Sequence, residues 1–504
     1  MRSLEALLLI ADLLTWLLLS VPQLRAAQWM RLSATGTLLI AVAQLLVEGP
    51  RWQLLPAYSL TALFFLVSML KNVAVSGGSA TRSRLTPLAA SLGMAWLAVS
   101  AALPMIVPVF RFPKPTGPHA IGTLTYHWVD AARSEVFAAD ALKRRELMVQ
   151  VWYPASALLA APRATYMPDA AVTAVIARIL NKPGFVLGHL EYVTTNAVSS
   201  APAAGDQASY PVLIFLEGAT GFRQMNTFQV EHLVSHGYIV AALDQPGAAA
   251  VVVFPDGHQA RGLATLAQFK TAVGPSYMPG RPNAPHNGLL LPNGRVLKDN
   301  SIVPYLAQDV IFTLDQLAYL NRADPNGVLT GKLNLQRVGA FGMSLGGIVV
   351  GEACRLDQRL RACLMMEAAM PTDVVKAGLQ QPSMWITRHA ADMRLERQQV
   401  GGWPEAEIEA HQTSMRAVYE GLMGDGYFVR VPGTFHFNFT DIPNWTPLAP
   451  MLGLAGPIDA LRAHDIVNAY SLAFFDRHLL SRPAKLLDGQ AQQYPEAIFE
   501  SRWP

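Results

Sequence analysis

Four apolar blocks in the first 110 residues constrain the fold of this 504-residue chain more than any other feature. The blocks cover residues 4–21, 33–47, 54–70 and about 85–110. A helix needs about 20 apolar residues to cross the hydrocarbon core of a bilayer. The first and last blocks meet that length, the third is adequate and the second is short. The pattern predicts a membrane domain, residues 1–110, of four transmembrane helices, with three as the alternative count.

The first block does not read as a cleaved signal peptide, because "LRAAQ" is a poor cleavage site and further apolar blocks follow it. Basic residues orient the predicted helices. The first and third connections hold Arg25, Arg31, Lys71, Arg82 and Arg84, and the opposite side holds Arg2, Arg51, Arg111 and Lys114. The positive-inside rule places the first set in the cytoplasm. We therefore expect a multi-pass protein whose remaining chain lies on the outer, periplasmic or extracellular, side.

Composition agrees with a chain that is partly in a membrane. Hydrophobic residues make up 51% and charged residues 15%, against roughly 25% charged residues in a typical soluble domain. The net charge of +3 and the absence of a long basic run argue against a nucleic-acid partner. Two cysteines, Cys354 and Cys363, fit no metal-ligand spacing, and we expect them to be small buried hydrophobic residues rather than a disulfide. Asp12, within the first block, is expected to face neighbouring helices.

After the Pro- and Gly-rich stretch 111–123 the pattern changes to that of a globular α/β domain, residues 111–504. Fully apolar runs predict strands buried on both faces, which is typical of parallel sheets. The runs cover 146–154, 210–218, 237–247, 335–344, 361–369, 382–390 and 427–436. Helical patterns at 228–236, 306–321 and 346–356 separate several of them, and 400–424 reads as a helix that could cover a site.

A G-x-S-x-G motif centres on Ser344 in "VGAFGMSLGG". An apolar strand enters the motif and a helix of small residues leaves it. This is the strand–turn–helix setting in which a serine hydroxyl stands exposed at the carboxyl end of a strand. Because the hydroxyl is a weak nucleophile, it needs a base, and in hydrolases of this fold the base is a late histidine.

The later histidines are His389, His411, His436, His464 and His478. His436 follows the last apolar strand in the loop "GTFHFNFTD", and we expect it to be the base. His411 lies in an acidic helical run and is expected to be solvated. His464 and His478 lie in helix-like surroundings and are expected at the surface.

From about residue 111 to 445 the chain resembles the platelet-activating factor acetylhydrolase type of α/β-hydrolase, in particular its bacterial esterase relatives. The resemblance rests on "FPKPTGPHAIGT", "RELMVQVWYP", "EGATGFR", "SHGYIVAALD", "VVFPDG", "VGAFGMSLGG" and "GTFHFNFTDIP". It implies an α/β-hydrolase fold with a mostly parallel central sheet. It also implies a serine esterase for short or oxidised acyl esters, of small molecules or lipids, without a metal or organic cofactor. The stretch "EGPRWQLLPAY" is similar to the N-terminal region of membrane-anchored bacterial members.

The resemblance also implies the roles of individual residues. It assigns Ser344 as the nucleophile, His436 as the base and Glu367 as the acid, where the family usually has Asp. Asp392, after the next strand, is the alternative acid. The oxyanion hole is expected to use the backbone N–H groups of Leu345 and Ala219. Here the chain departs from the family pattern, since Glu217 replaces a His, Thr220 a Gly, and Met343 and Leu345 the more usual His and Phe.

Two other readings remain open. The chain could be a non-catalytic, membrane-anchored interaction module that keeps a hydrolase fold. It could also use the same serine as an acyltransferase or a peptidase. An intact pair of Ser344 and His436 argues against the first of these readings, whereas the second needs product analysis.

Overall fold

The computed structural model describes residues 1–20, 27–75, 87–140, 142–156, 161–263, 268, 271–273, 289–291, 293–297 and 301–503. The chain forms two compact units. The first contains Met1–Phe110, Phe185–Val193 and Trp445–Leu448, and the second contains Arg111–Gly184, Thr194–Asn444 and Ala449–Pro504. The residues Arg25, Arg82 and Arg84, which the charge argument uses, lie outside the described residues.

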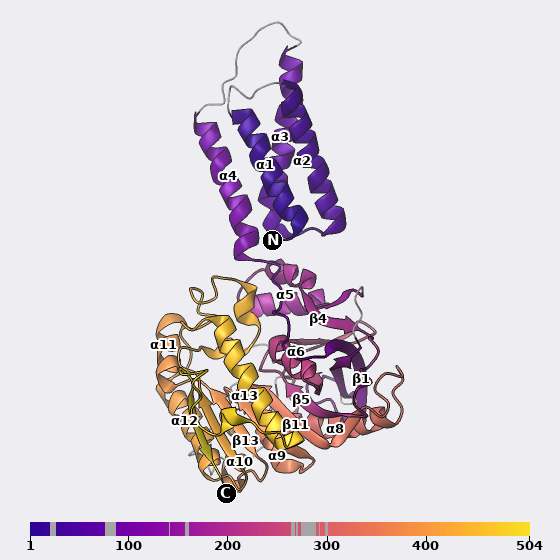
Figure 1. The fold of residues 1–504 in the computed structure, drawn as a ribbon, viewed down its shortest axis with the longest axis vertical. Helices are drawn as coiled ribbons and strands as arrows, with labels where there is room; N and C mark the ends of the chain where they lie inside the picture. The colour runs from indigo at the N-terminus through magenta and orange to yellow at the C-terminus, as the bar shows by residue number, and fades with distance from the viewer. Residues whose placement is uncertain are drawn as a thin grey trace. The chain divides into compact units, whose positions relative to one another are not determined.

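The first unit is built on four long helices that lie side by side (Figure 1). They are α1 (Ser3–Ser20), α2 (Ala27–Val47), α3 (Leu55–Val75) and α4 (Pro87–Ile106). Within the described residues, three stretches are long and apolar enough to cross a membrane: Ser3–Ser20, Gln28–Val47 and Trp52–Leu70. The apolar stretch of the fourth helix, Ala90–Ile106, is shorter. Length and composition therefore favour the alternative count of three candidate spans.

The helices of this unit carry apolar side chains outward and polar ones inward. Leu46 is 81% exposed and Leu39 is 64% exposed. Asp12 is fully buried, and its Oδ1 accepts a 2.9 Å hydrogen bond from the Thr61 hydroxyl, so it faces a neighbouring helix as expected. This distribution is the reverse of that in a water-soluble bundle.

The first unit also takes up a later piece of the chain, Phe185–Val193. The indole Nε1 of Trp52 donates to the carbonyl oxygen of Val186 at 3.1 Å, and the Tyr192 hydroxyl donates to that of Pro50 at 2.8 Å. The guanidinium of Arg2 lies over the Tyr192 ring, 4.8 Å from its centroid. Part of what the sequence assigned to the globular domain is therefore held by the helical unit.

An 11-stranded mixed sheet forms the centre of the second unit, in the order β15-β14-β13-β12-β11-β5-β6-β2-β1-β4-β3. Its strands are β1 (Ala120–Ser134), β2 (Arg144–Ala155), β3 (Arg163–Thr165), β4 (Thr194–Ser199), β5 (Tyr210–Leu216), β6 (Ile239–Asp244), β11 (Leu333–Met343), β12 (Leu360–Met366), β13 (Ser383–Thr387), β14 (Gly426–Arg430) and β15 (Ile498–Arg502). Two small hairpins pair β7 (Val251–Val253) with β8 (Gln259–Arg261) and β9 (Leu289–Leu290) with β10 (Val296–Leu297).

Six neighbouring strands at the centre of the sheet are parallel: β6, β5, β11, β12, β13 and β14. The pairs on either side of them, β2–β6 and β14–β15, are antiparallel. The helices are α5 (Ala170–Ile179), α6 (Thr227–Ser235), α8 (Val303–Arg322), α9 (Leu345–Leu356), α10 (Thr372–Ala377), α11 (Ala390–Val400), α12 (Glu405–Glu420) and α13 (Ala460–Leu480). Short 3-10 helices cover Trp52–Leu54, Gly184–Tyr192, His436–Phe439, Ile442–Trp445 and Lys485–Leu487. The predicted α/β alternation is confirmed.

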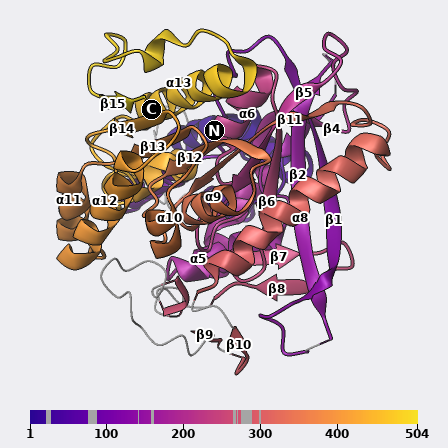
Figure 2. The same cartoon turned by 90° about the horizontal axis from the view of Figure 1, so that it is seen from below.

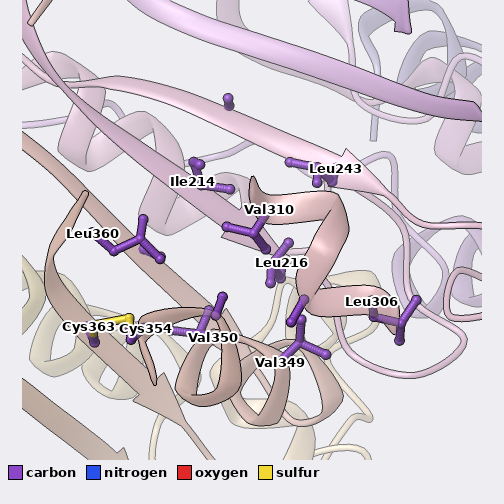
Figure 3. Close-up of a cluster of buried hydrophobic side chains, with 14 of the residues drawn as sticks. Ile214, Leu216, Leu243, Leu306, Val310, Val349, Val350, Cys354, Leu360 and Cys363 are labelled. Carbon is purple, nitrogen blue, oxygen red and sulfur yellow. A yellow bond between two sulfur atoms is a disulfide. The ribbon is translucent and has the colours of Figure 1, made fainter. Parts of the chain in front are cut away.

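Alternation along each strand assigns the two faces of the sheet. On β5, Ile214 and Leu216 join α8 and α9 in one buried cluster (Figure 3), while Leu213 and Phe215 join α6 and α13 in the other. Figure 2 shows these helices around the sheet. Helices cover both faces of the central strands, which is why these strands carry apolar side chains on both faces.

One expectation about the core is wrong. Cys354 at the end of α9 and Cys363 in β12 form a disulfide across a sequence separation of 9 residues (Figure 3). The spacing alone could not reveal the pair, because it does not say that the end of α9 returns beside β12. The bond closes the helix against the strand that follows it.

Candidate active site

Ser344 sits at the turn between β11 and α9. Its backbone has φ 55° and ψ −119°, a left-handed conformation that is costly for a residue with a side chain. The Ser344 N–H donates to the carbonyl oxygen of Met366, at the end of β12, at 2.8 Å. The serine is half-buried, whereas Met343 and Leu345 beside it are buried. The strained turn therefore holds the hydroxyl at the carboxyl edge of the sheet.

The motif glycines are needed for close approach of the backbone. A Cβ on Gly346 would lie 2.1 Å from the carbonyl oxygen of Leu216, at the end of β5. A Cβ on Gly342 would lie 2.4 Å from the carbonyl carbon of Gly346. No L side chain fits at either distance without a backbone shift, so the small residues are what let strand and helix meet here.

The loop "EGATG" lies against Ser344. A Cβ built on Gly218 would be 3.4 Å from the Ser344 Cβ. Two backbone hydrogen bonds fix the loop. The Thr220 N–H donates to the carbonyl oxygen of Ala248 at 2.7 Å, and the Gly221 N–H donates to the carbonyl oxygen of Gly218 at 2.9 Å. Among the described residues, the Ala219 N–H has no acceptor. It is available to a ligand at this edge.

Leu345 offers a second backbone donor. It is the first residue of α9, and the N–H groups of the first helical turn have no acceptor within their own helix. The positive end of the helix dipole lies at the same point. Leu345 directly follows Ser344, and Ala219 directly follows Gly218, which lies against Ser344. An oxyanion hole would need two backbone N–H groups of this kind.

Glu367 follows β12 directly and is fully buried. Its Oε1 accepts hydrogen bonds from the Thr387 hydroxyl at 2.6 Å and from the Arg388 N–H at 2.9 Å. Its Oε2 lies 2.6 Å from Nε of Arg388 and 3.3 Å from Nδ1 of His436. Burial alone would raise the pKa of Glu367, but the Arg388 charge and the His436 hydrogen bond bring it well below its ordinary value. The carboxylate is therefore ionised at neutral pH.

His436 begins the 3-10 helix His436–Phe439 after β14. The side-chain oxygen of Asn438 accepts from the N–H groups of Phe435 and Gly456, both at 2.7 Å, which fixes the loop. The imidazole is half-buried and contacts Glu367 through Nδ1. A carboxylate at Nδ1 leaves Nε2 as the nitrogen that can accept a proton. Among the described residues, the Ser344 hydroxyl forms no hydrogen bond, including with His436; such bonds commonly tighten only when substrate is bound.

The alternative acid, Asp392, has a different partner. Its Oδ1 accepts from the N–H of Gly433 at 3.1 Å, and it lies in the first turn of α11. It is not the carboxylate in contact with His436.

Two of the other late histidines, His411 and His464, lie in surroundings that differ from the prediction. His411 is 1% exposed and His464 is 4% exposed, so both predictions of surface positions are wrong. Each lies on the inward face of a long helix, α12 or α13. Burial lowers the pKa of His411 to about 4, so this ring is neutral at pH 7.

Two signals of the site were not read from the sequence. Thr220, Ser344 and Glu367 are three of the six non-glycine residues with positive φ in the described part of the chain. Strained backbone of this kind gathers at functional sites. The second signal is Trp403, whose ring centroid lies 5.5 Å from that of His436; it falls within the predicted helix 400–424 but just before α12, which begins at Glu405. Across the described ranges, no group of three or more His, Cys, Asp or Glu side chains is arranged to hold a metal ion.

Comparisons with known proteins agree on one family. The family model for "Platelet-activating factor acetylhydrolase, isoform II" matches residues 106–261. A platelet-activating factor acetylhydrolase from Cavia porcellus is 26% identical over 281 residues, covering 54% of this chain and 58% of that protein. A probable 1-alkyl-2-acetylglycerophosphocholine esterase from Arthroderma benhamiae is 23% identical over 312 residues, covering 58% of this chain and 67% of that protein. The matches thus span about three fifths of the length of these relatives.

A solved structure extends the likeness over the fold. The ferulic acid esterase from Streptomyces cinnamoneus superposes with a TM-score of 0.58 at 27% identity, covering 78% of this chain and 99% of that one. The sheet order, the turn at Ser344 and these comparisons all indicate the same fold. The chain is an α/β-hydrolase that resembles the platelet-activating factor acetylhydrolases.

Proposed function

We propose that the chain is a serine ester hydrolase in which Ser344, His436 and Glu367 form the catalytic triad. The observation that carries the proposal is the contact between Glu367 Oε2 and His436 Nδ1, at 3.3 Å. Glu367 directly follows Met366, whose carbonyl oxygen accepts the Ser344 N–H. Nucleophile, base and acid all come from the carboxyl edge of the same parallel strands, where α/β proteins bind their ligands.

The reaction would be acyl transfer in two steps. Nε2 of His436 takes the Ser344 proton while the hydroxyl oxygen attacks the ester carbonyl. The N–H groups of Ala219 and Leu345 bind the negative oxygen of the tetrahedral intermediate. The alcohol leaves with the proton from His436, and an acyl-enzyme remains. Water then attacks in the same way, which releases the acid and restores the serine. Glu367 stabilises the imidazolium in both steps and stays ionised.

We infer that the substrates are short or oxidised acyl esters, lipid esters among them. The names of the relatives support this, since they are acetylhydrolases and a probable esterase of an acetylated glycerophosphocholine. The half-buried Ser344 and His436 beside buried Met343 suit an ester with one apolar group.

We also propose that the first unit anchors the enzyme in a membrane, with the hydrolase unit on the outer side. Its exposed leucines and buried Asp12 support the anchor. The Cys354–Cys363 disulfide supports the outer side, because disulfides persist in oxidising compartments. Retention in the pellet after an alkaline carbonate wash, and protease access from the outside of intact cells, would test the two parts separately.

The function is tested by labelling with a fluorophosphonate, which reacts only with an activated serine. We expect the unmodified protein to be labelled and to hydrolyse p-nitrophenyl acetate, and Ser344→Ala to do neither. A protein that is not labelled would support the non-catalytic module. Labelling with acyl products on amines or other alcohols, and no free acid, would support the acyltransferase. Labelling with cleavage of peptide bonds and no ester hydrolysis would support the peptidase.

A further inference from the structure

A buried guanidinium joins two carboxylates behind the proposed triad. Arg388 follows β13 and its side chain is fully buried. Its Nε lies 2.6 Å from Oε2 of Glu367, and its Nη1 contacts Oε2 of Glu396 on α11. A buried arginine is costly unless its charge is compensated, and here two carboxylates share it.

Glu396 contacts both Arg388 and the backbone of His436. While Oε2 binds Arg388, Oε1 of Glu396 accepts a hydrogen bond from the backbone N–H of His436 at 3.3 Å. Glu367 contacts the ring of the same residue. His436 is therefore held at its ring and at its backbone by two carboxylates that one guanidinium fixes relative to each other. Trp403 covers the group, with Arg388 5.2 Å from its ring centroid.

The charges of this group bear directly on the imidazolium that forms during catalysis. The ionisable side chains around His436 are Glu367 after β12, Arg388 after β13, Glu396 on α11 and His411 on α12. Glu367 with Arg388 alone would be a neutral pair, which stabilises a nearby cation little. Glu396 adds the second negative charge, so the group carries a net charge of about −1 while His411 is neutral.

We propose that Arg388 and Glu396 are positioning residues of the esterase: Arg388 orients Glu367, and Glu396 holds the His436 backbone and supplies the net negative charge. The inference rests on the proposed function. It goes beyond the proposed triad, because Glu367 then acts on His436 only together with Arg388 and Glu396.

The experiment compares four variants of the full chain in detergent with the unmodified protein. Arg388→Met removes the charge, Arg388→Lys keeps the charge but lacks the planar fork, and Glu396→Gln keeps the acceptor for the His436 N–H but removes its charge. Arg394→Met is the matched control. Arg394 lies on α11, as Glu396 does, but its side chain is 44% exposed and pairs with Glu405 at the surface. Hydrolysis of p-nitrophenyl acetate is measured from pH 5 to 9, with active sites counted by fluorophosphonate labelling.

We expect kcat to fall about 10²-fold in Arg388→Met and about 10-fold in Arg388→Lys, with KM within about twofold of its starting value. The acidic limb of the pH profile should move to higher pH in Arg388→Met, because the imidazolium loses a repelling charge. It should move to lower pH in Glu396→Gln, because the imidazolium loses an attracting one, and stay in place in Arg388→Lys. Arg394→Met should match the unmodified protein.

Folded variants with unchanged kcat and an unmoved pH profile would overturn the inference. So would a loss of kcat that the thermal melts explain entirely, with both limbs unmoved. If Arg388→Met does not fold, Arg388→Lys and Glu396→Gln decide the matter. A protein whose hydrolysis is the same in Ser344→Ala would overturn the proposed function as well, whereas a Ser344-dependent activity that is indifferent to Arg388 and Glu396 would overturn only this inference.

Discussion

Replacement of Glu367 by Gln changes one atom at the point where the proposed acid meets the base. Oε1 of Glu367 accepts two hydrogen bonds, at 2.6 and 2.9 Å, from the end of β13. The oxygen of Gln can keep both, so its NH₂ group takes the place of Oε2. There it faces Nε of Arg388, which lay 2.6 Å from that oxygen and can only donate, so this contact is lost. It also faces Nδ1 of His436, which lay 3.3 Å from the oxygen.

The amide nitrogen can only donate, so Nδ1 of His436 must become the acceptor and the ring proton moves to Nε2. The nitrogen that should take the serine proton is then already protonated. A carboxylate-to-amide change at this position of a serine triad lowers kcat about 10⁴-fold, or about 5.5 kcal/mol in the activation free energy. We therefore expect Glu367→Gln to retain about 10⁻⁴ of the activity per folded molecule.

Asp392→Asn is the matched control. Its side-chain oxygen accepts from the Gly433 N–H, and an Asn oxygen can do the same, so we expect kcat within about threefold. Initial rates of p-nitrophenyl acetate hydrolysis below the melting temperature of each variant measure both changes. If Asp392→Asn loses about 10⁴-fold and Glu367→Gln stays active, Asp392 is the acid and the geometric reasoning is wrong.

Three further predictions concern stability. Gly346→Ala should lower the melting temperature, with a loss of about 3 kcal/mol, because the new Cβ would lie 2.1 Å from the Leu216 carbonyl oxygen; an unchanged melt would refute this. Burial raises the pKa of Glu231 from 4.5 to about 7, so the folded state binds more protons than the unfolded state in that window. The free energy of unfolding should fall by about 3 kcal/mol as pH rises from 4.5 to 7, and denaturant titrations should show a smaller fall in Glu231→Gln. Reduction of the Cys354–Cys363 bond should cost about 2.5 kcal/mol of unfolding free energy, whereas free thiols in the unreduced, unfolded protein would contradict the pairing.

The sequence predicted the parts of the fold that are apolar throughout. The runs at 210–218 and 335–344 became β5 and β11 because strands covered by helices on both faces need apolar side chains along their buried length, which in β11 begins at Val338. No apolar run predicted β1 or β15. β1 exposes alternate residues such as His127 and Val129, and β15 is a half-exposed edge strand, so neither carries a continuous apolar signal.

The candidate site was predictable where a local motif or a strand end carried it. Ser344 lies in a motif whose glycines have a steric reason, and His436 follows the last parallel strand. Arg388 and Glu396 could not be found this way. Arg388 lies at the end of the predicted apolar run 382–390 and Glu396 lies beyond it, and only the packing of α11 against the strand ends reveals that both charges are buried.

Residues 185–193 pack in the helical unit, and this affects which truncated fragments of the protein would keep their contacts. A fragment beginning at residue 111 would keep the whole sheet and every residue of the proposed triad. It would nevertheless lose Trp52 and Pro50, the hydrogen-bonding partners of Val186 and Tyr192, and Phe185 would lose the Trp52 ring whose centroid lies 5.8 Å away. The boundary at residues 110 and 111 therefore separates residues 185–193 from their contacts, and a fragment without residues 1–110 would need residues 185–193 redesigned.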